Sequence, residues 1–298
     1  MKSTANAVRR EKWFDRLSFN DGDEAFRAHW RKSFSQGLPP TFDCPEKPKS
    51  YSDIGVWCLG LEALNRVLAK LDLPGVSAAS SRMHILEDEV FTACLGSDLL
   101  GRCDCGHVFL RDRLDRIGQM AVLAHELVHL AARFDIRLAP TEKGARIEGV
   151  RNGYMRSSRG RRETPLFLGL NEAATEMIAC RVRRQLLEVV VCDGPQRDVM
   201  TEMRAYAAQI LVVVETAKRV GELAGIGAKD AGLLFCRGYF TGSDAFLRLV
   251  RLHDPAAYAA LRDMGKNPAD ARLAAERLGY ETVLARLAAP AAGAPVAT

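Results

Sequence analysis

Residues 121–134, AVLAHELVHLAARF, place two histidines and a glutamate among alanine, leucine and valine side chains. The apolar spacing around them predicts an α-helix over about 113–133 with apolar residues on nearly all its faces, which is typical of a central, buried helix. Ionisable side chains that are buried without partners are costly. His125, Glu126 and His129 therefore require a partner that compensates for their burial.

The spacing of the two histidines indicates that this partner is a metal ion. On a helix, residues four apart point in nearly the same direction one turn apart, so His125 and His129 can bind one ion. Their ring nitrogens can approach zinc to the roughly 2.0–2.1 Å that a zinc–nitrogen bond requires. Glu126 falls beside that ion, where it can act as the general base on a bound water, in the H-E-x-x-H arrangement.

A catalytic zinc needs a third protein ligand, which the stretch LGLNEAATEMIA (168–179) can supply. Glu172 and Glu176 lie four apart on a helix predicted to begin at Asn171, with apolar residues on both sides. One carboxylate can bind the metal, and the other can accept a hydrogen bond from a ligand histidine and fix its tautomer. Two glutamates at this spacing also occur on ordinary solvated helix faces, so this assignment depends on the first motif.

Asp135, six residues after His129, is the rival third ligand. Some zinc peptidases reverse the chain at this distance with a glycine three residues after the second histidine. Here that position is Ala132, which favours a continuing helix that carries Asp135 past the metal.

H-E-x-x-H at 125–129 followed by N-E-x-x-T-E at 171–176 resembles the gluzincin branch of zinc metallopeptidases, to which thermolysin-like enzymes belong. The resemblance covers roughly residues 80–185. It implies a zincin-like α+β fold, a small mixed sheet over an active-site helix, here with a mostly helical C-terminal half. It also implies that His125, His129 and Glu172 bind zinc, with Glu126 as catalytic base and Glu176 in an outer position where the thermolysin type carries aspartate. Extended peptide would bind the edge strand of the sheet, for which GHVFLR (106–111) is the candidate.

The segment between the two motifs is longer than in the thermolysin type, since residues 130–171, 42 in all, separate His129 from Glu172. Two extended stretches, RIEGVRNGYMR (146–156) and TPLFLGL (164–170), predict a hairpin that accounts for the surplus. The basic loop between them, with Arg159, Arg161 and Arg162, is interpreted as solvated.

Enzymes of this type use a tyrosine, histidine or arginine to stabilise the oxyanion that forms during amide hydrolysis. Tyr154 in the predicted hairpin and Tyr239 in FCRGYF are the candidates, with Arg237 and His253 as alternatives. Each of them is also an ordinary type of packing or surface residue.

The remaining elements complete a single metallopeptidase domain over residues 51–288, with a core at about 80–185 and a helical part at about 186–288. Strands are predicted at 82–86 and 90–95, and a helix at 61–73; Asp112, with Asp115, is predicted to cap the helix that carries the histidines. Further helices are predicted at about 197–222, 228–238, 243–253, 267–278 and 280–288. Residues 1–50 are predicted to be an irregular N-terminal segment, and 289–298 a disordered tail.

Composition restricts the class of protein and its partners. The 298 residues are 48% hydrophobic and 27% charged, which is typical of a soluble globular protein, and no apolar run is long enough to span a membrane. A formal charge of +5 without an aromatic stacking pattern argues against nucleic acid as a partner. No Sec-type signal is visible, so we expect a cytoplasmic protein, with export by another route left open. The eight scattered cysteines indicate reduced thiols, although Cys103 and Cys105 leave a metal clip open as an alternative.

The sequence therefore predicts a zinc-dependent metallopeptidase that hydrolyses peptide bonds in a peptide or protein substrate. Two alternatives stay open: a metalloprotease toxin or effector that cleaves one target protein, and a catalytically silent zincin-like binding or regulatory protein. Intact His125, Glu126 and His129 argue against the silent alternative, because a silent copy has no need of Glu126. Cleavage specificity, endo- against exopeptidase action and oligomeric state stay open.

Overall fold

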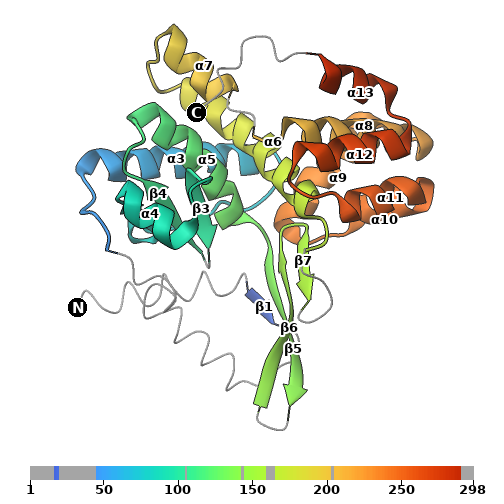
Figure 1. The fold of residues 1–298 in the computed structure, drawn as a ribbon, viewed down its shortest axis with the longest axis horizontal. Coiled ribbons are helices and arrows are strands. Elements are labelled where there is room, and N and C mark those ends of the chain that lie inside the picture. Colours follow the sequence, from blue (N-terminus) through green and yellow to red (C-terminus); the bar gives the residue numbers. More distant parts are fainter. Residues whose placement is uncertain are drawn as a thin grey trace.

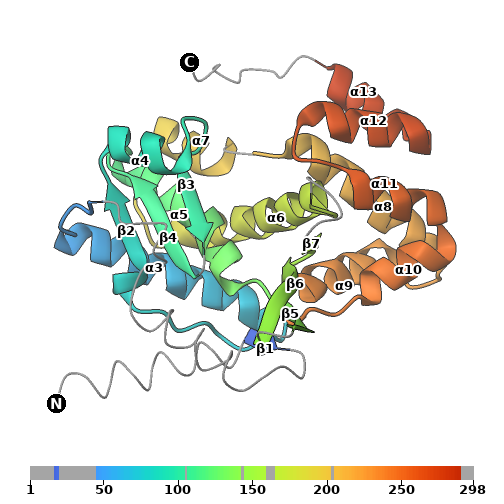
Figure 2. The same cartoon turned by 60° about the horizontal axis from the view of Figure 1, so that its bottom comes forward.

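A computed structural model describes residues 17–19, 45–104, 106–141, 144–158, 165–202 and 205–289. Within these ranges the chain forms eleven α-helices and two small sheets and is mostly helical, which confirms the predicted α+β class. Helix α6 runs between a sheet-containing N-terminal part and a C-terminal group of helices (Figures 1 and 2). None of the described helices has the length and apolarity that crossing a membrane requires.

The first sheet is three-stranded and mixed, with the order β2-β4-β3. Strand β2 (Met83–Leu86) is parallel to β4 (His107–Arg111), and β3 (Gly101–Asp104) is antiparallel to β4. All five residues of β4 are buried, and both of its edges are paired. The prediction that GHVFLR is the edge strand is therefore wrong, because this stretch forms the central strand and β3 takes the edge.

The stretch at 90–95, predicted as a strand, belongs instead to helix α4 (Asp88–Leu95). Asp88 and Glu89 lie in its first turn, where carboxylates stabilise a helix, and Gly96 ends it with a φ of 107°. Phe91 and Leu95, four residues apart, form the face that α4 buries. A short apolar run of this length fits either structure, and the helical spacing of its two buried residues decides.

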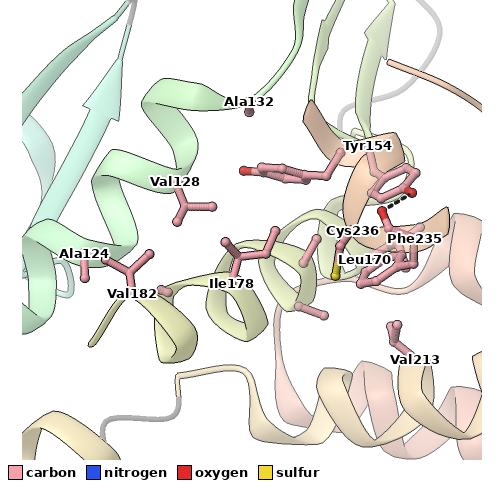
Figure 3. Close-up of a cluster of buried hydrophobic side chains, with 14 of the residues drawn as sticks. Ala124, Val128, Ala132, Tyr154, Leu170, Ile178, Val182, Val213, Phe235 and Cys236 are labelled. Atoms are coloured by element: carbon pink, nitrogen blue, oxygen red, sulfur yellow. Dashed lines mark hydrogen bonds between the residues drawn. The ribbon is translucent and has the colours of Figure 1, made fainter. Parts of the chain in front are cut away.

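Three helices, α3 (Tyr51–Ala69), α5 (Arg116–Ala131) and α6 (Leu168–Leu187), enclose much of the main core. Figure 3 shows Ala124 and Val128 of α5 next to Ile178 and Val182 of α6. Helix α3 starts ten residues before the predicted 61 because Ser50 and Asp53 form a capping box. Asp115, and not the predicted Asp112, caps α5 by accepting a hydrogen bond from the Gly118 amide.

The second sheet has the order β1-β5-β6-β7 and carries a long hairpin that extends away from the helices (Figure 1). Its strands are β1 (Leu17–Phe19), β5 (Phe134–Thr141), β6 (Gly144–Asn152) and β7 (Met155–Ser158). The predicted hairpin of 146–156 with 164–170 is reduced to one isolated antiparallel bridge, between Arg156 and Leu166. The chain instead turns inside the first stretch at Gly153, where Asn-Gly is a strong turn signal and φ is 57°. Residues 165–170 of the second stretch form no further strand pairing, and α6 begins at Leu168, before the predicted Asn171.

The C-terminal half is helical, as predicted, with two differences. Its helices are α7 (Gly194–Glu202), α8 (Ala207–Leu223), α9 (Gly227–Thr241), α10 (Ala245–His253), α11 (Pro255–Asp263), α12 (Pro268–Leu278) and α13 (Glu281–Ala288). The helix predicted at 197–222 is two helices, and the left-handed Tyr206, with a φ of 61°, directly precedes the second. The predicted set also lacks α11. The tail from residue 290, Cys105, Arg159, Arg161, Arg162 and most of residues 1–44 lie outside the described residues.

Candidate metal centre

Helices α5 and α6 bring together the three predicted ligands, two from one helix and one from the other. Nε2 of His125 lies 3.6 Å from Oε2 of Glu172, and Nε2 of His129 lies 3.5 Å from the same oxygen. The three side chains offer one ligand atom each within 4.8 Å of one another, and among the described residues they form the group suited to a metal ion. Each side chain is 13–15% exposed, so the cluster is close to the surface but largely enclosed.

These separations suit a tetrahedral zinc ion. Two ligand atoms bound about 2.0–2.2 Å from a tetrahedral centre lie about 3.3–3.6 Å apart, and the two nitrogen–oxygen distances agree with this range. The donor set of two imidazoles and one carboxylate leaves the fourth position for water, as catalytic zinc sites do. The residues therefore fit the ion that the sequence predicts.

Glu176 fixes the tautomer of His125. Nδ1 of His125 lies 2.9 Å from Oε2 of Glu176, a side chain that is only 1% exposed. Because a carboxylate accepts hydrogen bonds, Nδ1 carries a proton, so the neutral form of His125 would have its lone pair on Nε2, the nitrogen nearer Glu172. The predicted outer position of Glu176 therefore has a geometric basis.

A chain of hydroxyl groups fixes the tautomer of His129. The Thr175 hydroxyl donates to the Asn171 carbonyl at 2.9 Å, so its single proton is committed. Tyr239 Oη, 2.8 Å from Thr175 Oγ1, must then donate to Thr175 and can accept from Nδ1 of His129, 3.2 Å away. In their neutral forms, both histidines would therefore leave Nε2, the nitrogen on the side of Glu172, as the atom that can bind a metal.

Glu126 packs against Gly101 of the edge strand β3 and is 7% exposed. A Cβ atom at Gly101 of β3 would lie 2.5 Å from Val122 and 3.1 Å from Cγ of Glu126, so the missing side chain lets α5 approach the strand. The Cys103 backbone hydrogen-bonds the Glu126 carboxylate. Burial raises the pKa of Glu126 against the opposing effect of His125 and His129.

When no metal is bound, His125 and Glu172 shift each other's pKa. Burial opposes protonation of His125, but its hydrogen bonds with Glu172 and Glu176 outweigh burial and raise its pKa to about 10. Burial would also raise the pKa of Glu172, but its electrostatic interaction with His129 and its hydrogen bonds with both histidines lower it below its ordinary value. A metal ion must displace the proton of His125, so its binding releases a proton and weakens as the pH falls.

Asp135, the rival ligand, lies outside this cluster. Helix α5 ends at Ala131, and Ala132 is extended with a ψ of 151°, so the prediction of a helix that continues through Ala132 to 133 is wrong. The chain leaves the helix because the Arg133 amide donates to the Tyr239 carbonyl and starts strand β5. The Asp135 carboxylate accepts from Nε of Arg133 at 2.8 Å.

The predicted oxyanion-stabilising residues lie around the cluster in different places. The Tyr154 hydroxyl is fully buried and donates to the Phe235 carbonyl at 2.7 Å (Figure 3), and Tyr239 contacts the outer nitrogen of His129. Arg237 donates to the Leu71 carbonyl, and His253 ends α10. None of these contacts directs a group at the side where the three ligand atoms meet.

Tyr206, which the sequence did not single out, faces the ligands. Its ring stacks on that of His125 with centroids 6.0 Å apart, and its hydroxyl hydrogen-bonds Glu172. Burial and the charge of Glu172 raise the pKa of Tyr206, so the hydroxyl keeps its proton and can donate it in a hydrogen bond. Its unusual left-handed backbone between α7 and α8 has no sequence signal, because tyrosine rarely adopts it.

Cys103 lies on β3, while Cys105 is outside the described residues. The cluster of candidate ligands does not include Cys103. The alternatives for the C-x-C pair stay as the sequence left them.

Comparisons with models of protein families, with curated proteins and with solved structures find no match for this chain.

Replacing Tyr239 with phenylalanine is expected to weaken zinc binding about tenfold, within the range of outer-ligand losses, because Nδ1 of His129 loses its nearer acceptor and keeps only the 3.4 Å contact with Thr175 Oγ1. Competition with a chromophoric chelator measures the affinity. Tyr154→Phe is the matched control, since it removes a buried hydroxyl that contacts only the Phe235 carbonyl among the bonds described here. Unchanged zinc affinity in Tyr239→Phe, with slowed hydrolysis, would instead place Tyr239 on the substrate.

Proposed function

We propose that this protein is a zinc-dependent metallopeptidase with a zincin-like core. The observation that supports it most is the convergence of His125, His129 and Glu172, with Nδ1 of each histidine hydrogen-bonded so that Nε2 is the nitrogen left to bind a metal. A small mixed sheet beside the helix with both histidines, and a second helix with Glu172, agree with the fold that the motifs imply.

When bound, zinc would supply Lewis-acid chemistry, lowering the pKa of a bound water and polarising the peptide carbonyl. Glu126 would accept a proton at its carboxylate and later deliver it to the leaving amine, as its burial beside the histidines suggests. Tyr206 would exchange its hydrogen bond with Glu172 for one to the substrate oxygen on which negative charge develops, since its hydroxyl faces the ligands. An extended peptide would lie along β3, the edge strand nearest Glu126.

Two measurements on the wild-type protein test this function. Metal analysis of the purified chain should give about one zinc per chain, since His125, His129 and Glu172 supply one set of ligands. Proteome-wide cleavage profiling should reveal new peptide termini that disappear after chelation and return when zinc is added back. A chain that binds zinc but generates no termini in any proteome would favour a binding or regulatory role and overturn the proposed activity.

A further inference from the structure

Arg183 is a buried guanidinium group on α6, two turns beyond Glu176. Its side chain is 2% exposed, and Nη2 donates to Oε1 of Glu176 at 2.5 Å. The same nitrogen lies 3.0 Å from Sγ of Cys180, and Nε donates to the Met200 carbonyl at 3.0 Å. Arg183 therefore makes several bonds in an interior where a charged side chain is rarely placed without a specific partner.

The two oxygens of Glu176 have different partners. Oε1 accepts from Arg183, and Oε2 accepts from Nδ1 of His125 at 2.9 Å. A rotation of the carboxylate about its last torsion would disturb both bonds together, so the guanidinium fixes the oxygen that His125 meets. Because Glu176 and Arg183 are each about 1% exposed, removing either partner leaves an uncompensated charge in the interior.

Arg183 also contacts helix α7, which precedes Tyr206 in the chain. Met200 lies near the end of α7, and six residues later Tyr206 stacks on the ring of His125. One guanidinium group thus contacts both the carboxylate behind His125 and the helix that leads to the tyrosine beside it. Glu176 and Tyr206 both contact His125.

We propose that Arg183 is a positioning residue of the metal centre, which acts on His125 through Glu176. This inference rests on the metal centre of the proposed function but does not depend on peptidase activity. The positive charge of Arg183 and its two donor nitrogens, Nε and Nη2, both matter. A single ammonium group cannot reach Glu176 and the Met200 carbonyl with the same geometry.

Zinc affinity at one fixed pH tests the proposal, measured by competition with a chromophoric chelator. Arg183→Met should weaken binding about ten- to a hundredfold, as losses behind a metal ligand do, and Arg183→Lys should recover part of this loss. Glu176→Gln should weaken binding by a similar factor. The double variant Arg183→Met with Glu176→Gln should lose less than the product of the two single losses, since both act through one contact with His125.

Arg111→Met is the matched control for general destabilisation. Arg111 is 3% exposed and pairs with Asp88 at 2.5 Å, but it packs against α4 and has no contact with the three ligands among its described bonds. It should lower the melting temperature and leave zinc affinity unchanged. The visible spectrum of the cobalt(II)-substituted protein should shift in Arg183→Lys and not in Arg111→Met, because only the former alters how a ligand is held.

Wild-type zinc affinity in both Arg183→Met and Arg183→Lys would overturn the proposal, as would an equal loss of affinity in Arg111→Met. If Arg183→Met does not fold, Arg183→Lys decides by affinity and by its cobalt spectrum. Zinc binding without any cleavage in the wild type would refute the peptidase function while leaving the effect of Arg183 on zinc affinity measurable. A wild-type chain that binds no zinc would overturn both.

Discussion

Glu126→Gln is expected to keep about one zinc per chain while hydrolysis falls by roughly a hundred- to ten-thousandfold, the range that general acid–base catalysis contributes. Glutamine has the same shape as glutamate and can still accept the hydrogen bond from the Cys103 backbone, so the packing below β3 is kept. It cannot take up a proton, and Glu126 is not part of the ligand cluster. Metal analysis and cleavage profiling of the same preparation separate the two effects.

Glu62→Gln is a suitable control for this variant. Glu62 is an exposed glutamate on α3 that pairs with Arg66 one turn away, so its loss should change neither zinc content nor cleavage. A Glu126→Gln protein that cleaves as fast as the wild type would show that the peptidase assignment is wrong. Loss of zinc from it would show that Glu126 is itself a ligand.

The parts of the candidate site that could be predicted from the sequence are those that local periodicity determines. His125 and His129 share a face because any helix places residues four apart together, and Glu172 and Glu176 follow the same rule on a second helix. Bringing the two helices together depends on packing, which the apolar residues around each motif indicated only in general terms. The roles of these residues stay predictions.

Contacts between distant segments could not be predicted in this way. Tyr206 contacts His125 from the position between the end of α7 and the start of α8, and no spacing rule links the two residues. Arg183 was accessible in principle, since it follows Glu176 by seven residues, or two turns, on the same helix. The sequence does not distinguish Arg183 from Arg181 and Arg184 of the same helix, which have no contact with Glu176 among the described bonds.

The errors in the fold have local physical causes. The apolar run at 90–95 is too short for periodicity to separate strand from helix, and its acidic first turn was the signal that favoured helix α4. Asn152-Gly153 inside a stretch taken as one strand was the turn signal of the real hairpin between β6 and β7. Ala132 left the helix despite its high helix propensity, because backbone hydrogen bonds at the start of β5 outweigh a preference of well under 1 kcal/mol.

Glu172→Ala is expected to weaken zinc binding severely, by more than about a hundredfold, because it leaves two histidines and water to hold the ion. Oε2 of Glu172 lies 3.5 and 3.6 Å from the two histidine nitrogens, at the separation that a shared zinc ion produces. Glu176→Ala should cost less, about ten- to a hundredfold, because it removes only the acceptor behind His125. Zinc affinity, measured by chelator competition, ranks the two variants.

Asp135→Ala completes the comparison, since it removes the rival ligand. The extended Ala132 carries the chain away from α5 into β5, where the Asp135 carboxylate pairs with Arg133, so zinc content should stay near the wild-type value. The measurement discriminates because the two candidate ligands give opposite results. Zinc lost in Asp135→Ala and kept in Glu172→Ala would mean that the β5 hairpin folds back onto the metal, and the ligand set proposed from α5 and α6 would be wrong.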